Sequence, residues 1–382
     1  MRLSSRAALA WYIPLATLLL VACAREAPSP PPTPEWRLVE TWRVGGAPDG
    51  PFSFDNSRQV KRLPSGNLVL FDSKAGRLII LDTDGKLVAI GGRIGSGPGE
   101  VREATGFVID TTGDILVNDR GNTRLTRFSA DGKFLGVIPL SGSRFGAGAD
   151  WDAVVMKDGR LVELVEGVGR AEPVTQMIIW QRDFSRSDTL RIGTCEPRSA
   201  AALARDFVTL RTPKGAVILS MSMPMRFPDQ PTALDPAGFF WEQGVTTPSE
   251  VYRRSLGMCT SPDTLRLATV PGALTPASRE AVAKQARSYA QSVGAVSPEL
   301  PPPPERYPWY RSIVVGDDGH VWVTAWNGRE VTVHGVDGRE VAHLLWAASG
   351  RSAVITTDHV YRLEYDPDGV RFLVAYRIVK PG

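Results

Sequence analysis

Residues 113–136 read GDILVNDRGNTRLTRFSADGKFLG, and residues 66–89 read GNLVLFDSKAGRLIILDTDGKLVA. The two segments start 47 positions apart and align without a gap. Residues 319–341 align with the first copy in the same way, and weaker copies begin at Gly159 and Gly238. A repeat of this length indicates one supersecondary unit that is stacked several times along the chain.

Each copy has the pattern of an antiparallel meander. A glycine turn precedes a β-rich run, a loop leads to a second run, and an Asp-Gly turn such as Asp84-Gly85 leads to a third. Asp-Gly between apolar runs is a strong hairpin signal. Adjacent strand residues face opposite sides of a sheet, and both Leu68 and Val69 are apolar. Each small sheet is therefore covered on both faces, which predicts a β-propeller.

The number of blades follows from the turns that join the first and second strands. These turns fall near six residues: Gly66, Gly113, Gly159, Gly238, Gly319 and Asp358. The two intervals between Gly159 and Gly319 are each about 30 residues longer than a repeat, so seven blades remain an alternative. The sequence thus predicts an all-β, six-bladed propeller with two insertions.

The second insertion contains a helix over about residues 275–294. Thr275 is a good N-cap, Pro276 suits the first helical position, and Gly294 follows the end. The apolar stripe expected to face the propeller consists of Val282, Ala286, Tyr289 and Val293.

The two ends of the chain complement each other. The last unit has room for only three strands, whereas WRLVETWRVGGAPDGP at residues 36–51 resembles KLVAIGGRIGSGPGE at residues 86–100. The N-terminal strand should therefore be the outermost strand of the last blade, where it covers an open edge. We interpret GSGPGE as a tight crossover between blades, because it lacks the Lys-Ser/Thr and the helix of a phosphate loop.

A targeting segment precedes the propeller. Residues 1–22 combine basic residues with an apolar run and predict a signal peptide. They end in Leu-Val-Ala before Cys23, which resembles a bacterial lipobox, so Cys23 is the expected lipidation site. An ordinary secretory signal and an uncleaved anchor are the alternatives. Residues 23–36 form a Pro-rich linker, and the propeller covers residues 37–382.

This resemblance implies a location in the cell envelope. In a Gram-negative cell, Ala24 after the lipidated cysteine would direct the protein to the outer membrane, facing the periplasm or, as the alternative, the cell surface. The periplasm is oxidising and permits a disulfide between Cys195 and Cys259, with two unpaired thiols as the alternative. The chain carries a formal charge of only +3 without a run of like charges, which argues against nucleic acid as a partner.

Residues 95–136 resemble NHL-type repeats, with GSGPGEVREATGFVID as the leading motif. The lipobox, the helical insertion and the VRFLVAYRI ending resemble secreted six-bladed propeller lipoproteins of environmental bacteria. The resemblance covers roughly residues 37–382. It implies the fold and says little about function, because propellers host unrelated activities.

Lactonase-like propellers hold Ca²⁺ on the channel axis with Glu, Asn and Asp side chains, and this resemblance makes Ca²⁺ the one cofactor to consider. The corresponding oxygen ligands here would be Asp72, Asn118, Asp119, Glu242 and Asn327. The structural alternative is that an Asp after a strand caps its own turn. The four His lack metal-ligand spacing and no G-x-S-x-G motif occurs, so no catalytic residue is assigned.

Two classes of function therefore compete. The first is a membrane-tethered binding module for a glycan, a peptide or a protein, and the second is a metal-assisted hydrolase or lyase. Variable loops on a rigid frame favour binding, and aromatic rings beside polar groups suit a sugar or a peptide. The ligand-binding candidates on these loops are Asp72, Asp119, Arg120, Glu242, Arg311, Trp326 and Asn327.

Overall fold

The computed structural model describes residues 33–46, 54, 57–140, 151–167, 174–191, 207–222, 233–235, 237–243, 249–255, 263–267, 271–296, 305–307 and 309–381. Cys23, Cys195 and Cys259 lie outside these residues, as does the expected signal peptide. The lipidation and the disulfide therefore stay predictions. In the described part of the chain, no helix is both long and apolar enough to cross a bilayer.

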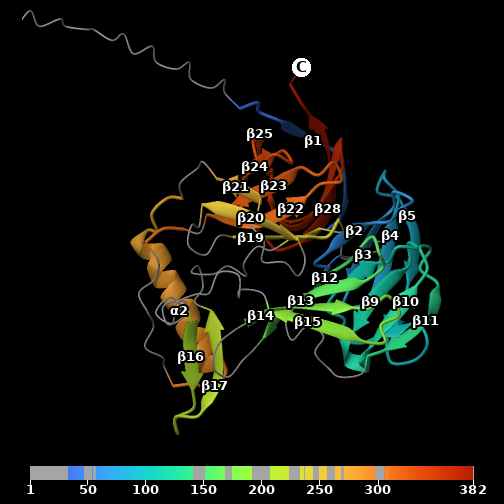
Figure 1. Cartoon of the computed structure of the whole chain (residues 1–382), viewed down its shortest axis with the longest axis horizontal. Helices are drawn as coiled ribbons and strands as arrows, with labels where there is room; N and C mark the ends of the chain where they lie inside the picture. The colour runs from blue at the N-terminus through green and yellow to red at the C-terminus, as the bar shows by residue number, and fades with distance from the viewer. Residues whose placement is uncertain are drawn as a thin grey trace, which may run out of the picture. The chain divides into compact units, whose positions relative to one another are not determined.

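Six four-stranded antiparallel sheets form the blades (Figure 1). Blade I contains β2 (Val60–Arg62), β3 (Leu68–Asp72), β4 (Arg77–Leu81) and β5 (Leu87–Gly91). Blade II contains β8 (Phe107–Ile109), β9 (Ile115–Asp119), β10 (Arg124–Phe128) and β11 (Phe134–Pro139). Blade III contains β12 (Asp152–Val155), β13 (Leu161–Gly167), β14 (Val174–Trp180) and β15 (Ser187–Arg191).

The second half of the ring repeats this order. Blade IV contains β18 (Ala233–Asp235), β19 (Phe239–Gln243), β20 (Glu250–Ser255) and β21 (Asp263–Arg266). Blade V contains β22 (Tyr310–Val315), β23 (Val321–Ala325), β24 (Glu330–His334) and β25 (Glu340–Leu345). Blade VI contains β26 (Ser349–Ile355), β27 (His359–Tyr365), β28 (Arg371–Val379) and β1 (Arg37–Gly45). The prediction of six blades is confirmed.

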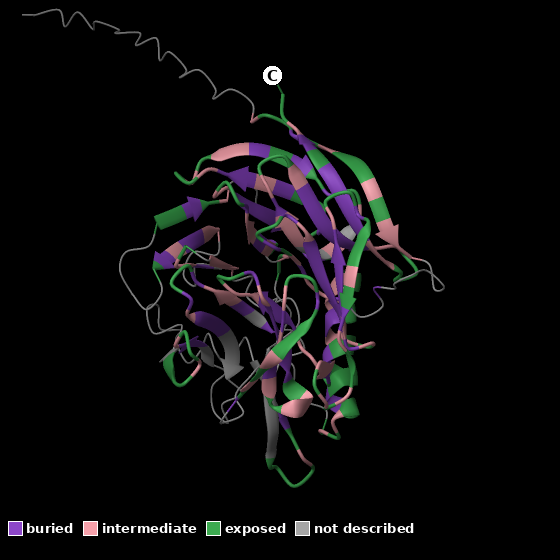
Figure 2. Cartoon of the chain, turned by 90° about the vertical axis from the view of Figure 1, so that its right-hand side faces the viewer, coloured by how far each residue is buried: buried purple, intermediate pink, exposed green. Residues whose placement is uncertain are grey.

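Apolar clusters between successive blades hold the ring together. Blades I and II share one such cluster, in which Val69 and Ile80 pack with Ile115 and Phe128. Comparable clusters join blades II and III, III and IV, IV and V, V and VI, and VI and I. Figure 2 shows that buried residues concentrate on the strands, while turns and loops are mostly exposed or partly exposed. The apolar residues on both faces of each strand thus have the role that the sequence predicted.

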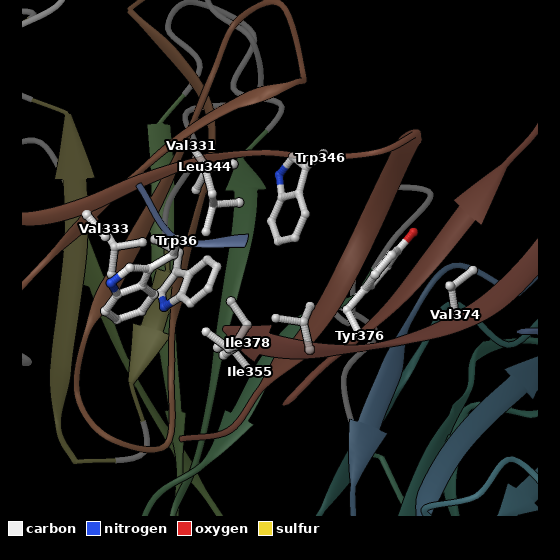
Figure 3. Packing of buried hydrophobic residues seen from close by; sticks show 12 residues of the cluster. Trp36, Val331, Val333, Leu344, Trp346, Ile355, Val374, Tyr376 and Ile378 are labelled. Atoms are coloured by element: carbon white, nitrogen blue, oxygen red, sulfur yellow. The ribbon is translucent and has the colours of Figure 1, made fainter. Parts of the chain in front are cut away.

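The N-terminal segment closes the ring, as predicted. β1 pairs antiparallel with β28, from Arg37 opposite Val379 to Gly45 opposite Phe372. The residues just before β1 also run along the outer edge of β25, because the Trp36 N–H donates to the His343 carbonyl over 3.0 Å. The Trp36 ring packs edge-on against Trp322. Figure 3 shows Trp36 within the apolar cluster between blades V and VI. One segment therefore covers the edges of two blades.

The two insertions contact each other. The second holds α2 (Pro276–Ser292), which begins where predicted, because the Ser278 N–H donates to the Thr275 hydroxyl over 3.1 Å. Its buried residues are Val282, Ala286 and Ala290, so the expected stripe is confirmed at Val282 and Ala286 and wrong at Tyr289, which is exposed, while Val293 is only partly buried.

The first insertion holds a hairpin of β16 (Phe207–Arg211) and β17 (Val217–Ser222), which the sequence analysis did not predict. The Val296 N–H, just after α2, donates to the Arg211 carbonyl over 2.9 Å, and Figure 1 shows β16, β17 and α2 side by side.

Short elements complete the crossovers. β6 (Arg93–Ile94) and β7 (Glu100–Val101) pair in parallel at the two ends of the GSGPGE segment. A 3₁₀ turn, η1 (Arg120–Asn122), connects β9 to β10. The GSGPGE segment lies between β5 of blade I and β8 of blade II, which confirms its interpretation as a crossover.

Candidate functional site

The strand order assigns the loops to two faces. Strands alternate in direction across each blade, so the turns after the first and third strands share one face, here called the turn face. The loops after the second strand and the crossovers between blades share the opposite face, here called the crossover face. All seven ligand-binding candidates lie on or next to loops of the crossover face, as their positions in the repeats indicated.

A cavity of about 190 Å³ opens on the crossover face between blades I and II. It lies where the crossovers enter the innermost strands β2 and β8 and where β3 ends. Two aromatic rings, two hydroxyl groups, a carboxamide and a guanidinium group line it. The lining residues are Arg58, Gln59, Phe71, Ser73, Ala104, Thr105, Gly106 and Phe107.

The Gln59 carboxamide is held in place by its neighbours. Its Nε2 donates to the Trp151 carbonyl over 2.9 Å, and its Oε1 accepts from the Phe107 N–H over 3.3 Å. Gly106 is needed beside it, because a Cβ at this position would lie 2.9 Å from Oε1 of Gln59 and 3.0 Å from Cβ of Trp151. The wall of the cavity is therefore preorganised across blades I, II and III.

The Thr105 hydroxyl is fixed from behind by Asn118. Nδ2 of Asn118 donates to Oγ1 of Thr105 over 3.0 Å, and the Trp151 N–H donates to the Thr105 carbonyl over 3.0 Å. The hydroxyl thus accepts one bond and keeps its own hydrogen to donate. Asn118 is fully buried, and its Oδ1 has no partner among the described residues, which is uncommon for a buried acceptor.

A buried carboxyl group, that of Glu163, lies behind Trp151, the residue that holds Gln59. Glu163 is fully buried and accepts from Nε1 of Trp151 over 2.6 Å and from Nε1 of Trp180 over 2.9 Å. Burial raises the pKa of Glu163 to about 7, although the two indole hydrogen bonds oppose that shift. A hydrogen-bonded chain therefore runs from Glu163 through Trp151 to Gln59 in the wall of the cavity.

Asp72 caps the loop that follows its own strand. Its Oδ1 accepts from the N–H groups of Lys74 and Ala75 over 3.0 and 3.2 Å. Its Oδ2 lies 3.6 Å from Nε of Arg77. Its side chain is buried next to Phe71, a residue of the cavity wall. Asp72 therefore caps its own turn, which is the structural alternative to a role as a calcium ligand.

Asp119 occupies the same position in blade II and is even more enclosed. It is fully buried and accepts from Arg102 N–H over 2.7 Å, from Nδ2 of Asn122 over 2.9 Å and from Nε of Arg124 over 2.7 Å. Its Oδ2 also accepts from the Thr126 hydroxyl over 3.0 Å. Arg124 in turn donates to two carbonyls of the GSGPGE crossover. Asp119 thus holds a loop and a crossover together, and we place it outside the ligand site.

Three of the remaining candidates form a separate group on blade V. Asn327 accepts from the N–H groups of Arg329 and Glu330 over 2.9 and 3.0 Å, so it too caps its loop. Trp326 is partly exposed beside it. Arg311 is exposed and covers the same loop, because a Cβ on Gly328 would lie 2.9 Å from its Nη1.

The candidates from blades I and II are not brought to this group by any contact in the described residues. Arg120 is exposed on η1, and Glu242 lies on β19 opposite Tyr252. Blade VI separates blade V from blade I in the ring.

In the parts of the chain that the structure describes, no three His, Cys, Asp or Glu side chains gather where they could hold a metal ion. The oxygens of Asp72, Asp119 and Asn327 are instead bonded to backbone or side-chain donors of their own loops. The cavity residues Gln59 and Thr105 were missed by the sequence analysis. Their one local signal was a polar residue shortly before an innermost strand, in SRQV and REATGF.

A second cavity of about 360 Å³ lies on the turn face. It is lined mainly by aliphatic residues of the innermost strands of blades I, II and III. Its cationic Arg62 is already paired with Asp317 over 3.1 Å.

Comparison with known proteins agrees with this architecture. Residues 52–145 match the profile of a family described as a 6-bladed beta-propeller. NHL repeat-containing protein 3 of Homo sapiens is 32% identical over 90 residues, which is 22% of this chain and 26% of the human protein, and the Mus musculus protein matches equally. The chain therefore spans about a quarter of the length of these curated relatives.

Two solved structures are similar to the chain over most of its length at low identity. A member of the duf4221 family from Bacteroides vulgatus has a TM-score of 0.50 at 11% identity, with 92% of this chain and 100% of that chain covered. A streptogramin B lyase has a TM-score of 0.46 at 11% identity, with 91% and 98% covered. The repeats, the six sheets, the family profile and the NHL relatives lead to one conclusion: the chain is a six-bladed β-propeller with NHL-like repeats.

Proposed function

We propose that this propeller is a binding module that holds a small polar-aromatic group, such as a sugar ring or a peptide side chain, in the cavity on its crossover face. The observation that carries the proposal is the preorganised wall of this cavity, where the carboxamide of Gln59 and the hydroxyl of Thr105 are fixed by residues behind them. Fixed polar groups beside aromatic rings are the usual composition of a ligand site.

The size of the cavity limits the ligand. Its volume of about 190 Å³ is smaller than the roughly 300–1,000 Å³ of pockets that enclose drug-sized ligands. Phe71 and Phe107 belong to the buried cluster between blades I and II and close the apolar side of the cavity, while Thr105 and Gln59 orient polar groups. The ligand therefore inserts one ring or side chain, and the rest of it contacts the variable loops around the opening.

Three further parts of the proposal rest on the sequence. The lipobox-like segment at Cys23 supports tethering of the module to a membrane, with the outer membrane of a Gram-negative cell as the proposed location. The partner is a glycan, a peptide or a protein rather than nucleic acid, in keeping with the low charge. Ca²⁺ is tested as a ligand in its own right, which keeps the metal-assisted alternative within the experiment.

The test is a thermal-shift screen of the purified protein with glycans, short peptides and CaCl₂, followed by calorimetric titration of the best binder. Ala104→Leu fills the cavity without removing a polar group, and Ala130→Leu is the control, because Ala130 is exposed on the turn face of blade II. We expect Ala104→Leu to weaken binding at least about tenfold, equal to about 1.4 kcal/mol, while both variants melt as the parent does.

A ligand that binds Ala104→Leu as tightly as the parent would refute the cavity as its site. Stabilisation by CaCl₂ alone, unchanged in Ala104→Leu, would favour the metal-assisted alternative instead.

A further inference from the structure

Trp151 contacts three residues of the cavity wall. It lies directly before β12 and is 1% exposed. Its carbonyl accepts from Nε2 of Gln59 over 2.9 Å, and its N–H donates to the Thr105 carbonyl over 3.0 Å. Its Cβ lies 3.0 Å from the position that a Cβ on Gly106 would take. A shift of the Trp151 backbone therefore moves the carboxamide and the hydroxyl group of the wall together.

The indole ring of Trp151 is fixed by a buried carboxyl group. Its Nε1 donates to Oε2 of Glu163 over 2.6 Å, and Nε1 of Trp180 donates to Oε1 of the same group over 2.9 Å. Glu163 is fully buried, and both rings belong to the apolar cluster between blades II and III. A buried indole N–H needs an acceptor. One carboxyl group thus serves two rings, and Trp151 links it to the cavity wall.

The two ionisation states of this carboxyl group hold the rings differently. An ionised carboxylate accepts at both oxygens, whereas a protonated one carries an O–H on one oxygen and donates there. Hydrogen bonds to an ionised acceptor are about twice as strong as neutral ones. Protonation therefore weakens the bond from Trp151, whichever oxygen takes the proton. The structure, in which each oxygen accepts from one indole, has the geometry of the ionised state.

Apolar residues surround Glu163. On the neighbouring strands of its sheet, Ala153 and Ile178 stand opposite it. Blade II contributes Leu116 and Leu125 to the cluster that holds both rings. The charged residues of β9 and β10 are paired with other groups, Asp119 with Arg124 and Arg127 with Asp114.

The environment of Glu163 sets the pH at which it changes state. Burial is the largest cause of its raised pKa of about 7, and the two indole bonds are the opposing causes. Among the described residues, no other titrating group contributes to this shift. The carboxyl group therefore ionises near neutral pH by itself.

Given the ligand site proposed above, we infer that Trp151 positions the cavity wall and that ionisation of Glu163, acting through the indole, switches this site. In acid the wall is loosely held, and at neutral and higher pH it is ordered and competent to bind. A ligand in the cavity favours the ionised carboxylate, since binding and ionisation are linked. An uncharged ligand therefore binds more tightly at pH 8 than at pH 5.

The side-chain NH₂ signals of Gln59 report the state of the wall. Nitrogen-15 NMR of the full chain follows them from pH 5 to pH 8, and Gln59→Ala assigns them. We expect one shift with a midpoint near pH 7, while the side-chain signals of Asn327, in a loop of blade V, stay in place. Because this readout needs no ligand, its failure is distinguishable from a failure of the proposed ligand site.

Three variants separate the switch from a general effect of pH. Glu163→Gln cannot ionise, so the Gln59 signals should no longer shift. Trp151→Phe keeps a ring but loses the N–H, and it should abolish the shift as well. Trp180→Phe is the matched control, because it removes the other bond to the same carboxyl group. It should keep the shift and move its midpoint to higher pH, since that bond lowers the pKa of Glu163.

The affinity for an uncharged glycan or peptide from the screen is the second readout. We expect the parent to bind it at least about fivefold more weakly at pH 5 than at pH 8, and Glu163→Gln to bind it equally at both. Gln59 signals that do not shift in the parent would overturn the switch. So would a shift that persists in Trp151→Phe or in Glu163→Gln, or equal affinity of the parent at both pH values. Cooperative melting of all three variants shows that they are folded.

Discussion

The carboxylate of Asp119 illustrates how a loop residue becomes part of the fold. Four groups donate to it, and one of them, Nε of Arg124, is charged and belongs to a side chain that is only 16% exposed. Removal of the carboxylate would leave this guanidinium group partly buried without its counter-charge, and such a change is strongly destabilising.

We expect Asp119→Ala to lower the free energy of unfolding by about 3 kcal/mol or more. The control is Asp337→Ala, because this turn aspartate has the same residue type but an exposed carboxylate, and it should change stability far less. Urea unfolding followed by tryptophan fluorescence measures both. Equal unfolding midpoints for the two variants would contradict the structural role of Asp119.

Glu163 should make stability depend on pH. Its pKa is raised from an ordinary value of 4.5 to about 7, so the folded chain keeps a proton that the unfolded chain loses between these values. Stability therefore falls as pH rises from 4.5 to about 7 and is flat with respect to this group above that. The shift corresponds to a loss on the order of 3 kcal/mol.

Glu163→Gln cannot ionise and should remove this slope, even if the new amide shifts stability by a constant amount at every pH. The measurement is the urea unfolding midpoint at pH 5 and at pH 8 for three proteins: the parent, Glu163→Gln and the control Glu330→Gln. Glu330 has an exposed carboxylate on β24. The interpretation fails if all three proteins lose the same stability between the two pH values.

At the scale of elements, the N-terminal segment contributes more than its length suggests. A chain that begins at Gly46 lacks β1 and Trp36, which leaves the outer N–H and C=O groups of β28 without partners. Loss of a buried aromatic side chain alone costs about 3–5 kcal/mol. We therefore expect the free energy of unfolding of this chain to be at least about 3 kcal/mol lower than that of a chain that begins at Thr33. Differential scanning calorimetry of the two chains measures the difference. Identical calorimetric profiles would show that β1 adds nothing to the ring.

The elements also show where sequence patterns suffice. Both residue faces of β3 are apolar and the turn before it contains Gly66, so local pattern alone indicated a stacked meander. The hairpin of β16 and β17 has the same local signals, with Gly215 in its turn. Whether such a hairpin joins a blade or an insertion is decided by contacts far along the chain, such as the bond from Val296 to Arg211. A short pattern does not contain that information.

The candidate site was only partly accessible to the same reasoning. The crossover face followed from strand direction, which alternates in every blade. The role of Asp119 did not, because it depends on how the GSGPGE crossover folds over β9 and brings the Arg102 N–H to the carboxylate. Gln59 and Thr105 were missed because a cavity wall is built from three blades at once.

At the scale of the whole molecule, the lipid anchor is the prediction with the widest consequence. Processing before Cys23 should give a mature protein that begins with a lipidated cysteine and partitions into detergent. Cys23→Ser should either block processing or release the protein into the soluble fraction. Mass spectrometry of the mature N-terminus and phase separation with detergent measure these outcomes. An unmodified N-terminus at another residue would refute the lipidation.

The pairing of β1 with β28 also sets the order in which the protein reaches its native state during synthesis. β1 is the first strand of the ring to leave the ribosome, and its partner is the last. Contacts so distant in sequence form slowly, and until they form, β1 and the edge of the last blade remain open to other chains. A truncated product that lacks residues 371–379 has no strand for β1 to pair with. A chain whose synthesis stops before β28 therefore cannot close the ring. Its unpaired strand edges stay exposed, and such edges are what chaperones and proteases recognise.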